Sequence, residues 1–323
     1  MMDDKYDVVV VGGGAAGLSA AVALGRARRS VLVVDAGAPR NAPAAHIHNY
    51  LGREGTPPAD LLAAGRATVA DYGGEVVTGT VTSAARGGTG FRVALDDGRA
   101  VQARRLLVTT GLVDELPDVA GLADRWGRDV LHCPYCHGWE VRDQAIGVLA
   151  TGPMAVHQAL LFRQLSADVT LFQHTAAALG PTEREQLAAR GVTVVDGGVA
   201  AVEVTDDRLT GVRLRSGEVV PRQVLVVAPR FTARADVLTT LGLDPVDEVF
   251  DGHVIGSLVP AAPTGATAVP GVWVAGNVAD LRAQVIVAAA AGLNTAAAIN
   301  ADLVMEDTAL AVVAHRASTP VSV

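Results

Sequence analysis

The segment spanning residues 7–35 constrains the fold of this chain more than any other part of the sequence. An apolar, β-branched run at 7–11 is followed by a G-x-G-x-x-G turn, an alanine- and leucine-rich stretch, a second apolar run at 31–34 and an acid, Asp35. The glycines of the turn are Gly12, Gly14 and Gly17. Glycine lets the backbone approach a pyrophosphate at a helix N-terminus, and the acid accepts a hydrogen bond from a ribose hydroxyl. We therefore predict a parallel α/β sheet that holds a dinucleotide at this turn.

The chain repeats this order of elements between residues 145 and 173, with changes at the positions that would touch a nucleotide. When Gly14 is aligned with Gly152, the other pairs are Gly12 with Ala150, Gly17 with Ala155, and Asp35 with Gln173. Ala150 adds a methyl group where the turn is tightest, and Pro153 removes a backbone N–H near the helix start. Gln173 lacks the charge that would hold a ribose diol, and no arginine follows it closely. We expect a second Rossmann-like unit whose degraded turn weighs against NAD(P)H; a retained scaffold or a site for another partner are the alternatives.

Cys133 and Cys136 are the two cysteines of the chain, and two residues separate them. A C-x-x-C pair can close into a small disulfide ring and reopen, and the neighbouring His137 can take the proton of a thiol. A structural disulfide and half of a zinc site are the alternatives. Adjacent residues cannot supply all four ligands of a tetrahedral zinc ion, and the N-terminus lacks the pattern of a secretion signal. We therefore expect a redox-active dithiol in a cytoplasmic protein, and we predict no metal site.

Length and charge limit the remaining possibilities. At 323 residues the chain exceeds a typical single domain, so two domains are expected. The formal net charge is −8 without a basic run, which argues against nucleic acid because phosphate neutralisation needs clustered Lys and Arg. The apolar stretch 283–299 is too short and too rich in alanine to span a bilayer, so we expect a buried helix there and no membrane partner.

Near the C-terminus, residues 270–277 are typical of a strand that ends in Gly276-Asn277, and a helix is expected from Gln284 to Ile299. A strand, a glycine turn and a helix N-terminus can together hold another part of a large cofactor, although an ordinary βα junction has the same pattern. The residues after about Asp307 lack clear signals for the start or end of a helix or strand, and we expect a frayed tail or an interface element there.

Four motifs, in this order, resemble the low-molecular-weight thioredoxin reductase-type FAD flavoproteins. They are the first glycine turn with Asp35, the turn Thr109-Thr110-Gly111, the C-x-x-C pair and Gly276-Asn277. The resemblance covers residue 6 to about residue 303, and it implies an α/β fold of two Rossmann-like domains with a three-layer ββα architecture. It also implies an FAD-binding domain formed by residues 1–114 and 245–323, an inserted NAD(P)-binding-like domain of residues 118–242 that carries the dithiol, and a homodimer.

The same resemblance implies the residues that bind the cofactor. They are Gly12, Gly14, Ala16, Gly17, Asp35, Arg40, Asn49, Thr110, Gly111, Gly276, Asn277, Gln284 and Val285. Asn277 stands where many relatives have an aspartate that holds the ribityl chain, and its amide can still donate and accept hydrogen bonds there. His46 and His48 lie in a loop that the resemblance places near the flavin, with a solvated loop as the alternative. His132 is either a second base or a surface or capping histidine.

The sequence Cys133-Pro-Tyr-Cys136-His137-Gly-Trp-Glu140 is similar to the branch that includes the gliotoxin and holomycin dithiol oxidases. Standard thioredoxin reductases have an aspartate where this chain has His137. The similarity implies that Cys133 faces the substrate, Cys136 lies against the flavin and His137 acts as the base. Electrons would pass from a small-molecule or protein dithiol through FAD to oxygen or another acceptor. Two alternatives stay open: a disulfide reductase fed by NAD(P)H, ferredoxin or another flavin, and a non-catalytic flavin-binding redox sensor.

Overall fold

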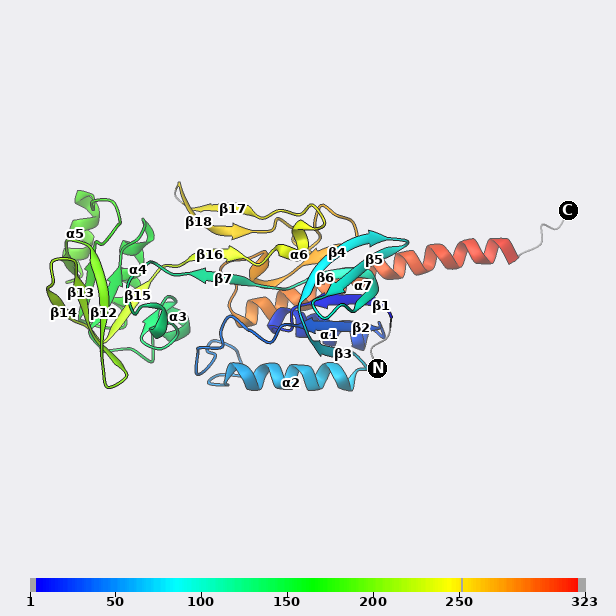
Figure 1. Ribbon diagram of the computed structural model, residues 1–323, viewed down its shortest axis with the longest axis horizontal. Coiled ribbons are helices and arrows are strands. Elements are labelled where there is room, and N and C mark those ends of the chain that lie inside the picture. The colour runs from blue at the N-terminus through cyan, green and yellow to red at the C-terminus, as the bar shows by residue number, and fades with distance from the viewer. Residues whose placement is uncertain (1–3, 251, 319–323) are drawn as a thin grey trace.

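The computed structural model describes residues 4–250 and 252–318, and it shows two α/β bodies joined by a pair of extended strands (Figure 1). The first body is built on a seven-stranded sheet in the order β3-β2-β1-β6-β5-β4, with β19 paired to β6. Its strands are β1 (Lys5–Val11), β2 (Val31–Asp35), β3 (Glu75–Thr78), β4 (Val81–Gly87), β5 (Gly90–Leu95), β6 (Ala100–Val108) and β19 (Val272–Val274), and its helices are α1 (Ala15–Arg26), α2 (Pro58–Asp71) and α7 (Val285–Ser318). The strands β3, β2, β1, β6 and β19 run parallel, as the glycine turn predicts.

Strand β1 is buried on both faces, which explains its continuous run of valines. Because successive side chains point to opposite faces, Val8 and Val10 pack with α1 and α7, whereas Val9 and Val11 enter the core on the other side of the sheet. The glycine turn therefore directly follows a strand that is buried on both faces.

The second body repeats the Rossmann pattern with a five-stranded, fully parallel sheet in the order β11-β10-β9-β15-β8. Its elements are β8 (Val130–Leu131), α3 (Pro134–His137), β9 (Ile146–Leu149), α4 (Met154–Phe162), β10 (Val169–Phe172), α5 (Pro181–Ala189), β11 (Thr193–Val195) and β15 (Val224–Val227), with a three-stranded antiparallel sheet of β12 (Val199–Thr205), β13 (Arg208–Leu214) and β14 (Val219–Pro221). The expected second Rossmann-like unit is therefore confirmed, and the dithiol segment follows its first strand.

Two neighbouring strands connect the bodies. Strand β7 (Leu112–Glu115) leads into the second body and β16 (Arg230–Ala233) leads back, and the two pair in antiparallel register. Strands β17 (Val246–Phe250) and β18 (His253–Leu258) extend this sheet in the order β17-β18-β16-β7. The residues that follow β16, including the short helix α6 (Asp236–Thr239), pack into the core of the first body.

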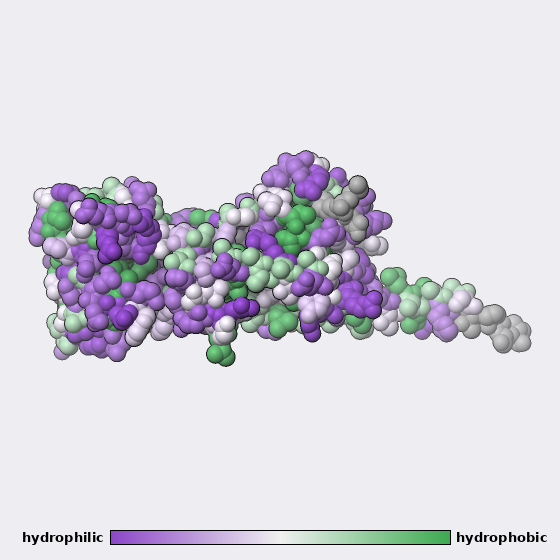
Figure 2. Space-filling view, turned by 90° about the horizontal axis from the view of Figure 1, so that it is seen from below, coloured by the Kyte–Doolittle hydropathy of each residue, from purple (hydrophilic) through white to green (hydrophobic). Residues whose placement is uncertain are grey.

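Helix α7 is longer than expected, because it continues to Ser318 rather than ending near Ile299. The residues after Leu293 are mostly good helix formers and include no Gly or Pro before Pro320. One face of α7 packs on α1, and Asp302, Glu306 and Asp307 form ion pairs with arginines of the first body. The distal end projects from the body and carries exposed hydrophobic side chains (Figures 1 and 2).

By length and hydropathy alone α7 could cross a bilayer. The packing of Ala288, Gly292, Ala296 and Ile299 against the first body identifies its proximal half as a core helix.

Candidate functional site

The turn between β1 and α1 forms a cradle that needs glycine for steric reasons. Gly12 has φ +105°, and a Cβ there would lie 2.6 Å from the carbonyl oxygen of Thr109. A Cβ on Gly17 would overlap the carbonyl oxygen of Gly12, so this glycine lets the helix sit against the turn. At Gly14 a Cβ would meet no atom of the described residues within 4 Å, and no side chain among them caps α1 there. The helix N-terminus is therefore open to a phosphate group.

Asp35 closes the cradle on the side of β2. Its Oδ1 accepts a hydrogen bond from the backbone N–H of Gly13 at 3.1 Å, and its Oδ2 pairs with Arg66 of α2 at 2.6 Å. The carboxylate retains lone pairs for a ribose hydroxyl. Arg66 was not expected from the sequence, because it lies in no motif and meets Asp35 through the packing of α2 beside β2 and β3.

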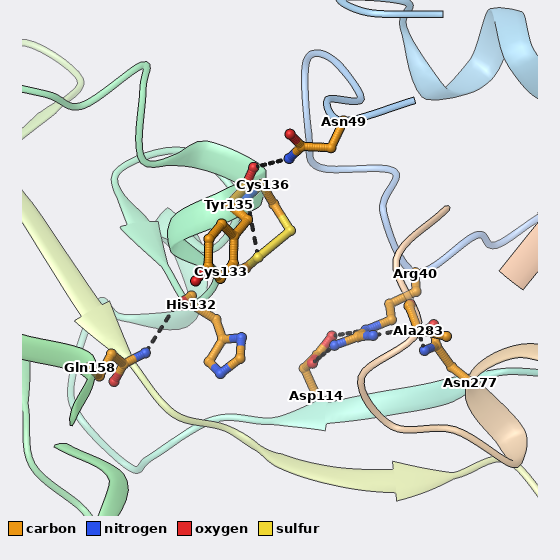
Figure 3. The surroundings of a disulfide bond; sticks show 10 residues. All are labelled: Arg40, Asn49, Asp114, His132, Cys133, Tyr135, Cys136, Gln158, Asn277 and Ala283. Carbon is orange, nitrogen blue, oxygen red and sulfur yellow. Dashed lines mark hydrogen bonds and ion pairs between the residues drawn. A yellow bond between two sulfur atoms is a disulfide. The ribbon is translucent and has the colours of Figure 1, made fainter. Parts of the chain in front are cut away.

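One cavity of about 1600 Å³ extends from this cradle to the dithiol of the second body. It is lined by most of the predicted site residues: Gly12, Gly14, Ala16, Asp35, Arg40, Thr110, Gly111, Cys133, Cys136, His137, Gly276, Asn277, Gln284 and Val285. Gly17 does not line it and acts by packing, as described above. Asn49 does not line it either, because its side chain points to the dithiol segment and donates to the carbonyl oxygen of Tyr135 (Figure 3). The fold thus gathers residues from four distant segments of the chain around one space.

The wall of the cavity nearest α7 is organised by Arg40. Its guanidinium donates two hydrogen bonds to Asp114 of β7, at 2.8 and 2.6 Å, and one to Oδ1 of Asn277 at 3.3 Å (Figure 3). Asn277 lies in a single 3₁₀ turn (η2, Gly276–Val278), and its amide nitrogen donates to the carbonyl oxygens of Asp280 and Ala283. Asn277 therefore shapes the approach to α7, a role that an amide can fill and a carboxylate cannot.

This arrangement fits FAD. The open helix N-terminus of the glycine turn suits the pyrophosphate, Asp35 suits a ribose, and the turn at Gly276 brings a second glycine backbone to the same cavity. Gly276 has φ +76°, so its backbone conformation also favours glycine.

Cys133 and Cys136 form a disulfide at the start of α3. The backbone N–H of Cys136 donates to Sγ of Cys133 at 3.1 Å, a contact that would stabilise negative charge on Cys133 after reduction. Within residues 4–250 and 252–318, no group of three or more His, Cys, Asp or Glu side chains is arranged to hold a metal ion.

Two histidines flank the disulfide and both line the cavity. Burial lowers the pKa of His137 below its ordinary value, with an opposing contribution from Glu140 and a further lowering from His48. Burial, followed by the charge of Arg40, lowers the pKa of His132 to about 4, with Asp114 acting against it. The His132 ring stacks edge-on against Phe231 at 5.2 Å, so it is packed at the cavity wall rather than free on the surface.

The second glycine turn also lines the cavity, but the chain around it is arranged differently from that around the first turn. The backbone N–H groups of Thr175 and Ala176 donate to the carbonyl oxygen of Ala150, so the chain after β10 folds over the end of β9. Gln173 does not reach the turn as Asp35 does, because its amide nitrogen donates to the carbonyl oxygen of Ala177. Arg215, which directly follows β13, was not expected near this turn; it lines the cavity, and its charge adds to burial in lowering the pKa of His174.

Known proteins show the same organisation. The family model described as pyridine nucleotide-disulphide oxidoreductase matches residues 6–292. Thioredoxin reductase tcpT of Claviceps purpurea (strain 20.1) is 30% identical over 292 residues, covering 84% of this chain and 86% of that protein. Thioredoxin reductase sirT of Leptosphaeria maculans is 29% identical over 315 residues, covering 91% and 93%.

Solved structures agree in both sequence and fold. The crystal structure of HlmI has a TM-score of 0.90 at 47% identity and covers 98% of each chain. An oxidoreductase from Agrobacterium tumefaciens has a TM-score of 0.85 at 35% identity, covering 93% of this chain and 99% of that one. A family model that spans residues 6–292 and a disulfide beside a dinucleotide cradle lead to one conclusion: the chain belongs to the pyridine nucleotide-disulphide oxidoreductases, as a thioredoxin reductase-like enzyme whose family implies FAD.

Proposed function

We propose that the protein is an FAD-dependent dithiol oxidase that closes two thiols of a substrate into a disulfide. The observation that carries the proposal is the single cavity that joins the disulfide to the open glycine cradle. The turn of the second body also lines this cavity, but the second unit carries Ala150, Pro153 and Gln173 in place of the residues that would hold a nucleotide. Electrons can therefore pass between the sulfurs and a bound flavin without a nicotinamide. The similarity of the dithiol motif to the dithiol oxidase branch supports the same direction.

The sulfur chemistry can be written with residues of this chain. A substrate thiolate attacks Sγ of Cys133, the Cys133–Cys136 bond breaks, and Cys136 leaves as a thiolate. The second substrate thiol loses its proton to His137 and attacks the substrate sulfur of the mixed disulfide, which forms the substrate disulfide and releases Cys133. The two cysteines have then gained the two electrons that the substrate has lost. FAD, when bound in the cradle, would take up these electrons and pass them to oxygen or another acceptor.

The environment of each group suits its role. The N–H of Cys136 points at Sγ of Cys133, which favours release of Cys133 as a thiolate in the second exchange. A lowered pKa keeps His137 neutral near pH 7, so that it can accept a proton. The substrate is a small-molecule or protein dithiol, since the disulfide is partly accessible and Tyr135 beside it is exposed.

Anaerobic mixing separates this proposal from a disulfide reductase, the activity in the names of the fungal relatives. The FAD-loaded protein is mixed with dithiothreitol, NADPH or NADH, and flavin absorbance is followed. We expect dithiothreitol to bleach the flavin, and air to restore the colour with release of peroxide. Rapid bleaching by either nucleotide at micromolar concentration would instead favour the reductase, with Arg215 as the candidate contact. Flavin that responds to no thiol would favour a redox sensor.

We further propose that two copies assemble through α7. The exposed side of this helix carries residues at spacings of three or four: Ile286, Ala290, Leu293, Ala297, Ala301, Val304, Thr308 and Ala311. None of these is charged, and the projecting end of the helix carries exposed apolar side chains beside polar ones (Figure 2). Small residues let a second helix approach closely, and a two-fold axis would pair the two stripes antiparallel. A homodimer is the occupant that this self-complementary stripe favours.

A further inference from the structure

The loop of residues 46–54, here named the contact loop, belongs to the first body and reaches the dithiol segment of the second. Asn49 donates from its side-chain amide to the carbonyl oxygen of Tyr135, which lies between the two cysteines (Figure 3). His48 places Nε2 3.4 Å from Oε1 of Glu140, three residues after His137. Both contacts join parts of the chain that are more than 80 residues apart, and neither was visible in the sequence.

The contact loop is built to present these two side chains in fixed positions. Glu54 pairs with Nδ1 of His48 at 2.6 Å and accepts a hydrogen bond from the backbone N–H of Asn49 at 2.9 Å. Backbone hydrogen bonds join Ile47 to Thr56 and to Gly55, and the Ile47 side chain is buried. Asn49 itself has φ +60°, a conformation that asparagine tolerates better than most residues. Such bracing limits the rotamers of His48 and so reduces the entropy lost when it meets Glu140.

The two residues that the contact loop reaches, Tyr135 and Glu140, belong to the same segment as His137, the proposed base. Two charged groups face His137, namely Glu140 from its own segment and His48 from the contact loop, and Glu54 in turn faces His48. The carboxylate of Glu140 raises the pKa of His137, and the charge of His48 lowers it. The position of the contact loop therefore affects both where the disulfide lies and how readily His137 takes a proton.

We propose that His48 and Asn49 are positioning residues, which hold the dithiol segment against the flavin cavity through Glu140 and the Tyr135 carbonyl. The proposal rests on electron transfer between the dithiol and the flavin, in either direction. The chain crosses between the two bodies in the strands β7 and β16, and Pro43 of the first body also packs near Gly127 of the second. A turn of the second body about these strands would carry the dithiol away from the flavin cavity. The contact loop opposes such a turn, and it keeps Glu140 oriented toward both histidines.

The test uses the FAD-loaded protein and three substitutions that preserve local geometry. Glu140→Gln keeps the size of the side chain, His48→Asn keeps a polar side chain, and Asn49→Gly keeps the left-handed backbone. Arg53→Gln is the matched control, since Arg53 lies exposed in the same loop and has no side-chain partner recorded among the described residues. Dithiothreitol is the probe, and the rate of anaerobic flavin bleaching is measured by stopped flow from pH 5.5 to 9.

We expect each of the three variants to bleach about fivefold more slowly or worse, and Arg53→Gln to match the parent protein. In the double variant His48→Asn/Glu140→Gln the loss should be no larger than in the slower single variant, because the two residues form one contact. The pH profile gives a second readout that a general loss of stability would not produce. The acid limb should move to lower pH in Glu140→Gln and to higher pH in His48→Asn.

The outcomes separate the two proposals. If dithiothreitol does not bleach the flavin of the parent protein, the proposed function is wrong, and the positioning role that rests on it is overturned with it. If the parent bleaches but the three variants do so at the parent rate, or if both acid limbs move the same way, the positioning role is wrong. Full multiplication of the single effects in the double variant would also overturn it, since independent residues behave in that way. Flavin content and circular dichroism of each variant identify any that fails to fold, and the remaining variants still decide the question.

Discussion

We predict that a single methyl group added to α7 at Gly292, where this helix packs against α1 at the glycine cradle, will weaken cofactor binding. A Cβ at Gly292 of α7 would overlap the carbonyl oxygen of Ala16, and Ala16 lines the cofactor cavity one residue before Gly17. The overlapped atom belongs to the backbone of α1, so it cannot rotate away as a side chain would. In Gly292→Ala, α7 and α1 must therefore move apart at the base of the cradle.

Two effects of opposite sign compete in this variant. Alanine is favoured over glycine inside a helix by about 1 kcal/mol. Overpacking of a dense interior costs about 1–3 kcal/mol, and a rigid backbone neighbour places this site near the upper end. The overlap therefore wins, and we expect a net loss of about 2 kcal/mol in the free energy of unfolding. For a chain of this size the melting temperature would fall by about 3 °C.

Urea unfolding followed by circular dichroism measures the stability, and fluorescence of released FAD measures cofactor affinity. Ala298→Gly is the matched control, because Ala298 is only half-buried on the same helix and lies outside the exposed stripe. This control should lose about 1 kcal/mol through helix propensity alone and retain FAD as the parent does. The reasoning is refuted if Gly292→Ala is more stable than the parent and binds FAD equally well, since propensity would then have outweighed the overlap.

Three further predictions address the chemistry and the assembly. In Cys136→Ser, bleaching of the flavin by dithiothreitol should fall by about 100-fold or more, and a rate equal to that of the parent would show that the dithiol is not the route of electrons. Because His137 accepts a proton only when neutral and its pKa is lowered below 6.5, the bleaching rate divided by the ionised fraction of dithiothreitol should hold down to that pH and fall only in more acid solution; an acid limb centred above 6.5 after this division would contradict the prediction. Leu293→Glu, in the exposed stripe of α7, should convert a dimer into a monomer in light scattering, whereas Val219→Glu on the second body should not; a monomeric parent that floats with lipid vesicles would instead assign the stripe to a membrane.

Much of the fold could be predicted because its demands are local. The turn requires residues without a Cβ at Gly12 and Gly17, and the continuous valines of β1 are typical of a strand buried on both faces, so the sequence alone predicts a Rossmann-type sheet. The repeated unit around Gly152 was found in the same way. The length of α7 was underestimated because a helix was expected only to Ile299 and a frayed tail or an interface element after about Asp307, whereas α7 continues to Ser318.

The site was predicted less completely, because its polar contacts join distant segments. Arg66 meets Asp35, Arg40 meets Asp114, and His48 meets Glu140, and in each case the partners lie on different elements. Asn49 was assigned to the cofactor by resemblance, and its side-chain amide donates to the carbonyl oxygen of Tyr135, a contact that no motif indicates. No spacing rule relates such pairs, since their distances depend on how separate elements of the chain pack together.

The sequence by itself determined the two sheets, the glycine cradle and the presence of a closable dithiol, since each depends on the conformational freedom or chemistry of neighbouring residues. Tertiary structure alone decided that the disulfide and the cradle share one cavity, that Thr175 and Ala176 donate to the carbonyl oxygen of Ala150, and that Glu140 and His48 both act on the pKa of His137. The physical reason is that burial and Coulomb interactions depend on distances in space, which the chain sets only when its separate segments pack together.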